Sequence, residues 1–365
     1  MPEPAEGLDA TAIGPVSCSD WASSQGLSPI GTAGDYDGLL LVEQPLPWPQ
    51  DIAQLAELVD VAPLAASANL RLQAIVPVGT LAPVPGGIEV TGGVGGAGGK
   101  RRVVLYRTPA PPGRSPELGG AGESMPMGSA PFAAPSRWAA PLVRSETVTE
   151  AGSLAEAVTA LLEVPRSYEP GRPTAEGNGT GDIVDVLVCT HGRRDMCCGS
   201  KGTDLVGTLL DDPISAPEAE VRLWRTSHTG GHRFAPTAVV LPSATLWAWA
   251  SPSLLQAVAM GAGPLEEVTP HYRGCACLGS PQEQALEMAV LSEVGWGLLA
   301  SARRAIKLGG ERLRLETELF GSWEAAVVEG RRVPQPDCRT NPGTATRSGV
   351  EWVVEDLRSV GAGVD

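Results

Sequence analysis

The sequence predicts an α/β protein in which neighbouring parallel strands belong to a mixed sheet. Three consecutive segments carry this prediction: the β-branched apolar run 183–190, the helical pattern 204–210 and the alternating run 220–227. A strand, a helix and a second strand in this order form a right-handed parallel crossover unit. Both strands therefore end at the same edge of the sheet, and we expect the loops that follow them to lie close together.

Further elements are expected on both sides of this unit. Before it, apolar runs predict strands at 38–44, 70–77 and 101–107, and apolar residues at helical spacing follow Pro49. After it, the patterns predict a strand at 237–241, a long helix at 282–307 and strands at 313–318, 325–329 and 350–355. The glycine tract 91–99 predicts a hairpin loop, and the Pro- and Gly-rich stretch 109–135 predicts a surface excursion or linker.

Composition excludes several classes of partner and location. The 27 basic and 42 acidic residues give a net charge of −15, with no dense basic block of the kind that binds nucleic acid. The uncharged segment 234–265 is interrupted by prolines, so we expect a buried strand, a turn and a short helix rather than a membrane span. The first residues have no basic or apolar region typical of a signal peptide, and we therefore expect a cytoplasmic protein.

The seven cysteines are grouped rather than spread along the chain. Cys189, Cys197 and Cys198 lie together, and so do Cys275 and Cys277. Without an export signal, such grouping favours a metal site or reactive thiols over a disulfide framework. Two residues do not complete a coordination shell, so we assign the 275–277 pair to packing. Cys18 and Cys338 stand alone and receive no role.

The strongest group of candidate metal ligands lies in the two loops at the shared edge of the parallel unit. The first strand leads into a Cys-x8-Cys loop, with Cys189 and Cys198, and the second leads into a His-x3-His loop, with His228 and His232. Two thiolates and two imidazoles on converging loops form a complete ligand set for a metal centre. The two glycines between the histidines permit tight bends, so that both imidazoles can turn inward.

Other residues of the same loop have open roles. Cys197 competes with Cys198, because adjacent cysteines point in different directions and only one is needed. His191 is expected to be a hydrogen-bond donor behind the ligands, or an ordinary loop residue, rather than a ligand. Arg193 and Arg194 either hydrogen-bond the surroundings of the metal and steer an anionic partner, or are solvated loop charges.

Several motifs together resemble one known family. The chain is similar to the sucrase/ferredoxin-like family, whose carboxy-terminal region resembles thioredoxin-like [2Fe-2S] ferredoxins. The match spans roughly residues 15 to 310 and is supported in the amino-terminal third by Cys18-Ser19-Asp20, Gly31-Thr32-Ala33, Val42-Glu43 and Pro47-Trp48. Its specific motifs are CTHGRRDMCCG, SHTGGHRFAPTAVVLP and Tyr272-Arg273-Gly274.

The resemblance implies a [2Fe-2S] cluster held by Cys189, Cys198, His228 and His232, and it favours Cys198 over Cys197. It also implies an amino-terminal α/β domain with a Gly/Pro-rich insertion at 1–145 and a thioredoxin-like ferredoxin domain at 146–310. A β-rich extension would follow at 311–365. Neutral imidazoles make a cluster easier to reduce, since two-His centres lie at roughly −150 to +300 mV and plant-type ferredoxins at about −400 mV.

The expected function is electron transfer or redox sensing, and a non-enzymatic electron carrier is favoured over an enzyme. No flavin or nicotinamide signature is present, so a redox protein or a small-molecule reductant would supply the electrons. Sucrase activity is not expected, because glycoside hydrolysis needs a pair of carboxylates that no motif here identifies. Two alternatives are a structural zinc protein that uses the same four ligands, and a thiol oxidoreductase with Cys197 or Cys198 activated by Arg193 and Arg194.

Overall fold

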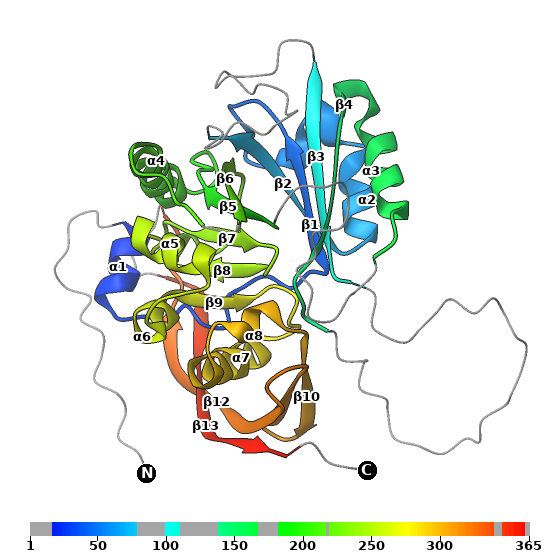
Figure 1. The fold of residues 1–365 in the computed structure, drawn as a ribbon. Helices are drawn as coiled ribbons and strands as arrows, with labels where there is room; N and C mark the ends of the chain where they lie inside the picture. The colour runs from blue at the N-terminus through cyan, green and yellow to red at the C-terminus, as the bar shows by residue number, and fades with distance from the viewer. Residues whose placement is uncertain are drawn as a thin grey trace, which may run out of the picture.

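A computed structural model describes residues 17–78, 99–109, 138–166, 182–216, 219–338 and 345–361 (Figure 1). Within these ranges a large mixed sheet forms the centre of the molecule. Its strands, in spatial order, are β4 (Val143–Glu150), β3 (Lys100–Arg107), β1 (Gly38–Glu43), β2 (Leu70–Pro77), β6 (Ala219–Thr226), β5 (Asp182–Cys189), β7 (Ala238–Leu241), β8 (Thr245–Trp247) and β9 (Tyr272–Cys275).

The expected parallel unit lies in the middle of this sheet. β5 and β6 pair in parallel, with Cys189 opposite Thr226 at the shared end, and helix α4 (Met196–Asp211) connects them. Helix α2 (Val61–Ser67) connects a second parallel pair, β1 and β2. The α/β class is therefore confirmed, and the loops after β5 and β6 leave the sheet at the same edge.

The two halves of the sheet meet where β2 pairs antiparallel with the end of β6. Behind this junction the buried carboxylate of Asp185 accepts hydrogen bonds from the Tyr106 hydroxyl and, at 2.7 Å, from the Trp224 indole N–H. A buried carboxylate needs such donors, because an unpaired one would be costly. The division at residues 145 and 310 stays a prediction, and the sheet is continuous across the first of these positions.

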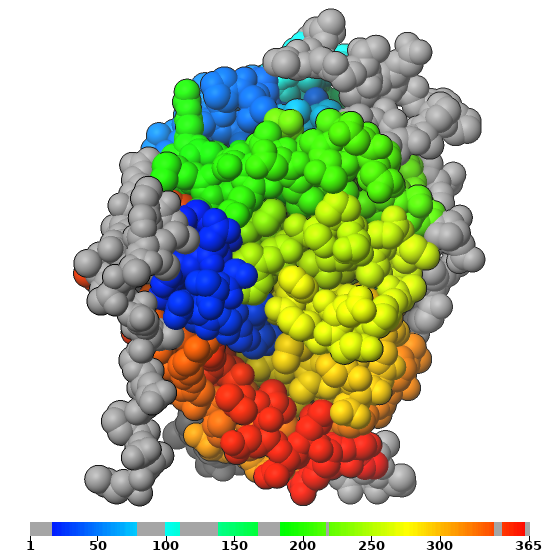
Figure 2. Space-filling view, turned by 90° about the vertical axis from the view of Figure 1, so that its left-hand side faces the viewer, coloured from blue at the N-terminus to red at the C-terminus, as the bar shows by residue number. Residues whose placement is uncertain are grey.

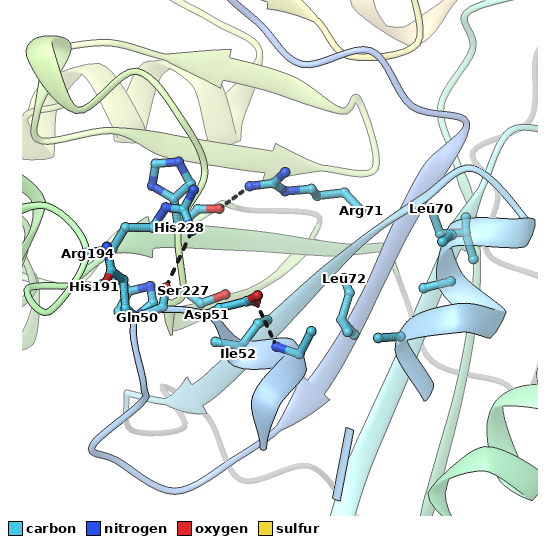
Figure 3. A pocket seen from close by; sticks show the side chains of 14 residues that line it. Gln50, Asp51, Ile52, Leu70, Arg71, Leu72, His191, Arg194, Ser227 and His228 are labelled. Carbon is cyan, nitrogen blue, oxygen red and sulfur yellow. Dashed lines mark hydrogen bonds between the residues drawn. The ribbon is translucent and has the colours of Figure 1, made fainter. Parts of the chain in front are cut away.

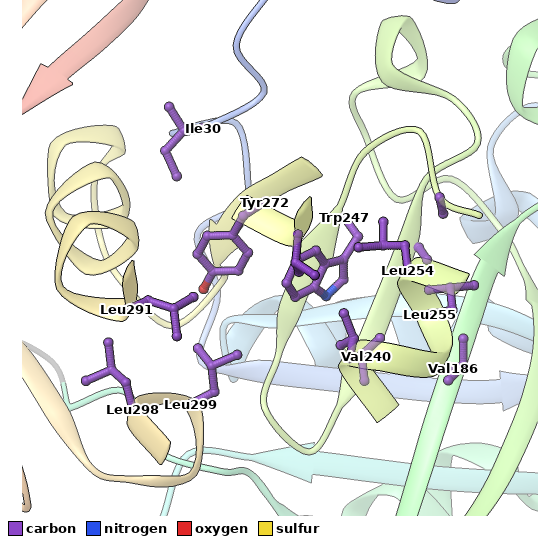
Figure 4. Close-up of a cluster of buried hydrophobic side chains, with 14 of the residues drawn as sticks. Ile30, Val186, Val240, Trp247, Leu254, Leu255, Tyr272, Leu291, Leu298 and Leu299 are labelled. Carbon is purple, nitrogen blue, oxygen red and sulfur yellow. The ribbon is translucent and has the colours of Figure 1, made fainter. Parts of the chain in front are cut away.

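Helices cover the sheet on both of its halves (Figure 1). α3 (Leu154–Glu163) packs with α2 against the amino-terminal strands around Leu40, Val103 and Val158. The other half forms the largest apolar core, in which Trp247 and Tyr272 pack against leucines of the covering helices (Figure 4). The helices of this half are α4, α5 (Pro252–Met260), α6 (Leu265–Val268), α7 (Pro281–Val294) and α8 (Gly297–Ala300).

Three helix predictions are corrected by the structure. The pattern at 282–307 is not one helix: α7 ends before Gly295, whose φ of +89° is left-handed, and α8 and a strand follow. The segment after Pro49 forms two short 3₁₀ turns, Ile52–Gln54 and Ala56–Leu58, before α2. The helix expected at 204–210 begins earlier, at Met196. The predictions for 91–98 and 110–135 lie outside the described residues.

A separate four-stranded antiparallel sheet follows α8. Its strands are β10 (Arg303–Gly309), β11 (Arg312–Thr317), β12 (Ser322–Pro334) and β13 (Ser348–Val360). The Arg331 guanidinium on β12 donates to the Gly26 carbonyl at 3.0 Å, and Glu351 accepts from the Ser28 N–H at 2.8 Å. The small sheet therefore lies against the segment after helix α1 (Cys18–Ser24), as Figure 2 shows for the blue and the orange and red residues.

Among the described residues, no helix combines the length and the apolar character that crossing a membrane would require.

Candidate metal centre

The loop after β5 places two cysteines in the first turn of a helix. Asp195 precedes α4, and Cys197 and Cys198 follow at its start, both buried. Consecutive residues on an α-helix point about 100° apart. Cys198 therefore faces Cys189 at the end of β5, whereas Cys197 faces the amino-terminal helix α1. Gly202 allows this arrangement, because a Cβ at that position would lie 2.0 Å from the Cys189 carbonyl oxygen.

Cys189 and Cys198 form a buried thiol pair. A hydrogen bond from the Cys198 thiol lowers the pKa of Cys189 to about 6, although burial opposes this shift. The backbone N–H groups of His191 and Thr229 also point to the Cys189 sulfur. The shared hydrogen bond and the burial raise the pKa of Cys198. The hydrogen bond thus favours Cys189 over Cys198 as the thiolate of the pair, and the thiolate is the form that binds metals.

The loop after β6 turns sharply between its two histidines. Gly230 and Gly231 both adopt left-handed φ values, +84° and +70°. A Cβ at Gly231 would lie 2.5 Å from the Arg273 guanidinium, which donates to the Gly230 carbonyl at 3.1 Å. Only glycine fits this close backbone approach. The turn brings His232 back towards α4 while His228 stays beside β2.

Asp195 connects the two imidazoles. His228 Nδ1 lies 2.6 Å from one carboxylate oxygen of Asp195, and His232 Nε2 lies 4.0 Å from the other. Burial favours the neutral acid, but the hydrogen bond to His228 and the charges of both histidines lower the pKa of Asp195. A carboxylate bound to one imidazole nitrogen orients the ring and leaves its other nitrogen for a metal. Asp195 was missed from sequence, because the helix was expected at 204–210 and not directly after this residue.

A second group of thiols, here called the thiol trio, lies around His232. It consists of Cys18, Cys197 and Cys338. The Cys18 sulfur lies 3.1 Å from the Cys197 sulfur and 3.4 Å from the Cys338 sulfur. His232 Nδ1 lies 3.2 Å from Cys18 and 3.3 Å from Cys338. The donor atoms of Cys18, His232 and Cys338 all lie within 4.8 Å of one another, so this group is compatible with metal binding.

The four predicted ligands thus lie in the same region of the protein, but they do not all contact one another. Cys189 contacts Cys198, and His228 contacts Asp195. His232 lies beside the same carboxylate, but its Nδ1 faces the thiol trio. Cys18 and Cys338, which sequence reasoning left without a role, are in direct contact with Cys197 and His232. Each of these two cysteines stands alone in the sequence and far from the other, so no spacing motif indicates that they lie close together.

The remaining candidates of the first loop face the amino-terminal half. His191 Nε2 lies 2.8 Å from the Pro49 carbonyl oxygen, and its ring packs edge-on against Trp48 with centroids 5.8 Å apart. Burial lowers the pKa of His191. Arg194 donates to the Gln50 carbonyl at 3.4 Å, and Arg193 is exposed. His191 and Arg194 therefore connect the loop to residues 48–50, away from the thiols.

A cavity of about 280 Å³ lies next to His228 (Figure 3). Its floor is apolar, with Ile52, Leu70 and Leu72, and the guanidinium of Arg71 donates to the His228 carbonyl at 2.7 Å. The polar residues of its wall are Gln50, Asp51, Arg71, His191, Arg194, Ser227 and His228. Two arginines and two histidines suit a small molecule with an anionic group and an apolar body.

These features define an α/β protein with a centre of thiols and imidazoles that is compatible with metal binding. The family described as Sucrase/ferredoxin-like matches residues 29–274, more than half of the chain. The chain therefore belongs to the sucrase/ferredoxin-like family, as the resemblance had indicated. The matched residues include Cys189, Cys198, His228 and His232. Cys18 lies before the matched range and Cys338 lies after it. No curated protein and no solved structure matches the chain.

Proposed function

We propose that this protein is an electron-transfer or redox-sensing protein that carries a [2Fe-2S] cluster on Cys189, Cys198, His228 and His232. The observation that carries the proposal is the position of both ligand loops at one end of the parallel strands β5 and β6, around the carboxylate of Asp195. Thiolates and imidazoles are ligands that such clusters take. When bound, the cluster would accept and return single electrons.

The chain's own residues prepare these ligands in different ways. Cys189 is already favoured as a thiolate by the hydrogen bonds that it accepts. His228 is oriented through Nδ1 by Asp195, so Nε2 is its ligand nitrogen. The full burial of Cys189 and Cys198 excludes water from the sulfur side of the site. The histidines are less buried and form the side through which electrons would enter or leave.

Imidazole ligands couple the electron to a proton. When a cluster is bound, its reduction would add negative charge, which would raise the pKa of a ligand imidazole and favour uptake of a proton. The reduction potential would therefore fall as the pH rises between the two pKa values of that imidazole. The limiting slope for one proton per electron is about 59 mV per pH unit. A potential that does not change with pH would argue against histidine ligation.

The composition and the cavity suggest which partners exchange electrons. A redox protein or a small-molecule reductant is the proposed partner, and the cavity beside His228 offers a small reductant direct access to that imidazole. The net charge of −15 disfavours nucleic acid as a partner. We place the protein in the cytoplasm, where thiols remain reduced.

Purification under anaerobic conditions, followed by iron and sulfide assays, tests the proposal directly. We expect two irons and two sulfides per chain, a red-brown colour, and an EPR signal after reduction with dithionite. Changing His228 and His232 to cysteine should lower the potential, because anionic thiolates would replace neutral imidazoles. A colourless protein without iron would overturn the proposal.

A further inference from the structure

The proposed cluster leaves three clustered thiols unexplained. Cys18 comes from α1, Cys197 from α4, and Cys338 from the segment after β12. These segments are far apart in the sequence, since 320 positions separate Cys18 from Cys338. Their sulfur atoms nevertheless meet at 3.1 and 3.4 Å from Cys18, and Cys18 and Cys338 both contact Nδ1 of His232. Packing alone does not require three thiols and one imidazole nitrogen to converge.

The donor atoms of Cys18, Cys338 and His232 Nδ1 are spaced nearly as three ligands of a tetrahedral metal site, and the Cys197 sulfur lies 3.1 Å from that of Cys18. Zinc binds thiolates at about 2.3 Å and imidazole nitrogen at about 2.0–2.1 Å, so tetrahedral donors lie roughly 3.5–3.8 Å apart. The observed separations of 3.1–3.4 Å are a few tenths of an ångström shorter. A small outward movement of Cys18, Cys338 and His232 would therefore admit an ion, and Cys197, which contacts Cys18, would turn toward it as the fourth ligand. Three cysteines and one histidine form a closed structural set for zinc.

The close approach of several thiols makes a cation at this position favourable. The side chains of Cys18 and Cys197 are buried, and Cys338 is partly buried. Thiolates confined at such distances repel one another, so without a cation most of them must remain protonated. A bound divalent ion removes this repulsion and stabilises the deprotonated thiols together.

His232 lies between this group and the proposed cluster. Its Nδ1 faces Cys18 and Cys338, whereas its Nε2 lies 4.0 Å from Asp195, the carboxylate that also contacts His228. The two nitrogens of an imidazole point in different directions. One ring can therefore contribute a nitrogen to each of two neighbouring sites, provided that it releases its N–H proton to solvent and bridges the two metals as an imidazolate.

We propose that Cys18, Cys197, Cys338 and Nδ1 of His232 bind one soft divalent metal ion, zinc, at a site separate from the iron cluster. The ion would connect α1, α4 and the segment after β12 at one point. It would also fix the ring of His232 beside the iron site. This second site does not depend on the presence of a cluster, because three of its four ligands take no part in the cluster.

Metal analysis of full-length variants tests the second site. Zinc and iron per chain would be measured for the unchanged protein, Cys338→Ala, Cys189→Ala and the control Cys275→Ala, which removes a buried thiol from a different core cluster. We expect Cys338→Ala to lose zinc and keep iron, Cys189→Ala to lose iron and keep zinc, and Cys275→Ala to keep both. Loss of a hydrogen-bond partner of a metal ligand lowers metal affinity by roughly 10- to 100-fold. Cys338→Ala removes a ligand itself, so its zinc affinity should fall by at least this factor.

A cobalt titration gives a second readout that does not depend on the iron. Co²⁺ bound by thiolates absorbs in the near ultraviolet, and this absorption should be present in Cys189→Ala and absent in Cys338→Ala. Circular dichroism of both variants would establish that each is folded.

Three outcomes separate the second site from the proposed function. Zinc binding that is unchanged in Cys338→Ala would overturn the second site. Loss of iron in Cys338→Ala, with iron retained in Cys189→Ala, would show that the thiol trio holds the iron, which overturns both the second site and the cluster ligands. Zinc that depends on Cys338 in a protein without iron would support the second site and contradict only the electron-transfer proposal.

Discussion

The two groups of thiols differ in how the fold assembles them. Cys189 and Cys198 belong to one strand–loop–helix segment, and their contact follows from local geometry. The thiol trio is assembled from the amino-terminal helix, the central helix and a segment after β12. A spacing motif in the sequence therefore reveals only the ligands that one loop contributes. Ligands that converge through tertiary structure leave no comparable pattern.

The surroundings of the two groups differ as well. Cys189 and Cys198 are fully buried at the end of the central sheet, where their shared hydrogen bond lowers the pKa of Cys189 and raises that of Cys198. The trio lies nearer the surface, because Cys338 is partly exposed and Asp337, which is half exposed, lies 3.8 Å from His232 Nε2. The buried pair suits a centre that is shielded from water, and the trio suits an ion that holds segments together.

The largest expected effect comes from removing the thiolate of the buried pair. Cys189→Ala should abolish iron and sulfide binding and the visible absorption of the protein, because it removes one of the four proposed cluster ligands. Iron assay and absorption spectroscopy measure this. Cys275→Ala serves as the matched control and should retain both signals. Full iron content in Cys189→Ala would eliminate this residue as a ligand.

Removal of zinc by a chelator should loosen the segments that the trio connects. Amide hydrogens of α1 should exchange faster after zinc removal, by about 100-fold when the free zinc concentration had been 100 times its dissociation constant. Amides of β1, within the central sheet, should be unaffected. Hydrogen-exchange mass spectrometry checks both segments at once. Equal exchange of α1 with and without zinc would contradict a role of the ion in holding this helix.

Removing the charge between the histidines should raise the reduction potential. Asp195→Asn deletes a buried negative charge that stabilises the oxidised centre, and a shift of about 59 mV corresponds to a tenfold change for one electron. We expect an increase of that order in a redox titration. Asp337→Asn is the control, since its carboxylate is more exposed and solvent screens it. A shift in Asp337→Asn as large as in Asp195→Asn would contradict the central role of Asp195.

The smallest expected effect concerns the contact of the metal loop with the amino-terminal half. His191→Ala should lower the free energy of unfolding by about 1–2 kcal/mol, through loss of the hydrogen bond to Pro49 and the contact with Trp48. Urea unfolding measures this, and metal content should stay constant. Loss of metal in His191→Ala would instead identify His191 as a ligand.

The lowered pKa of His191 predicts how its contribution to the free energy of unfolding changes with pH. Burial lowers the pKa of His191 in the folded protein below its ordinary value of 6.5, so folding favours the neutral ring. Its contribution to stability is complete above that ordinary value and is lost as the pH falls through the lowered pKa. The stability difference between the unchanged protein and His191→Ala should therefore shrink on acidification below about pH 6.5. A difference that grows in acid would show the opposite sign.

Much of the fold follows from local patterns in the sequence. The strands near residues 70–77, 183–190 and 220–227 lie where apolar alternation and β-branched runs predict them. The predicted helix at 282–307 is wrong beyond Val294, because apolar periodicity does not register the left-handed glycine that ends α7. Within the site, sequence spacing identified the two motif loops. It could not identify Cys18 and Cys338, whose proximity depends on how the small sheet packs against the segment after α1.

The wide separation of the trio in the sequence has a consequence for biosynthesis. A ribosome adds roughly 5 to 20 residues per second, so the 320 positions between Cys18 and Cys338 need on the order of 16 to 64 s. Throughout that interval the nascent polypeptide displays an incomplete set of ligands. Zinc could be captured tightly only after residue 338 has emerged and its segment has docked. Metal retention would then report that translation has passed this point and that folding has been completed.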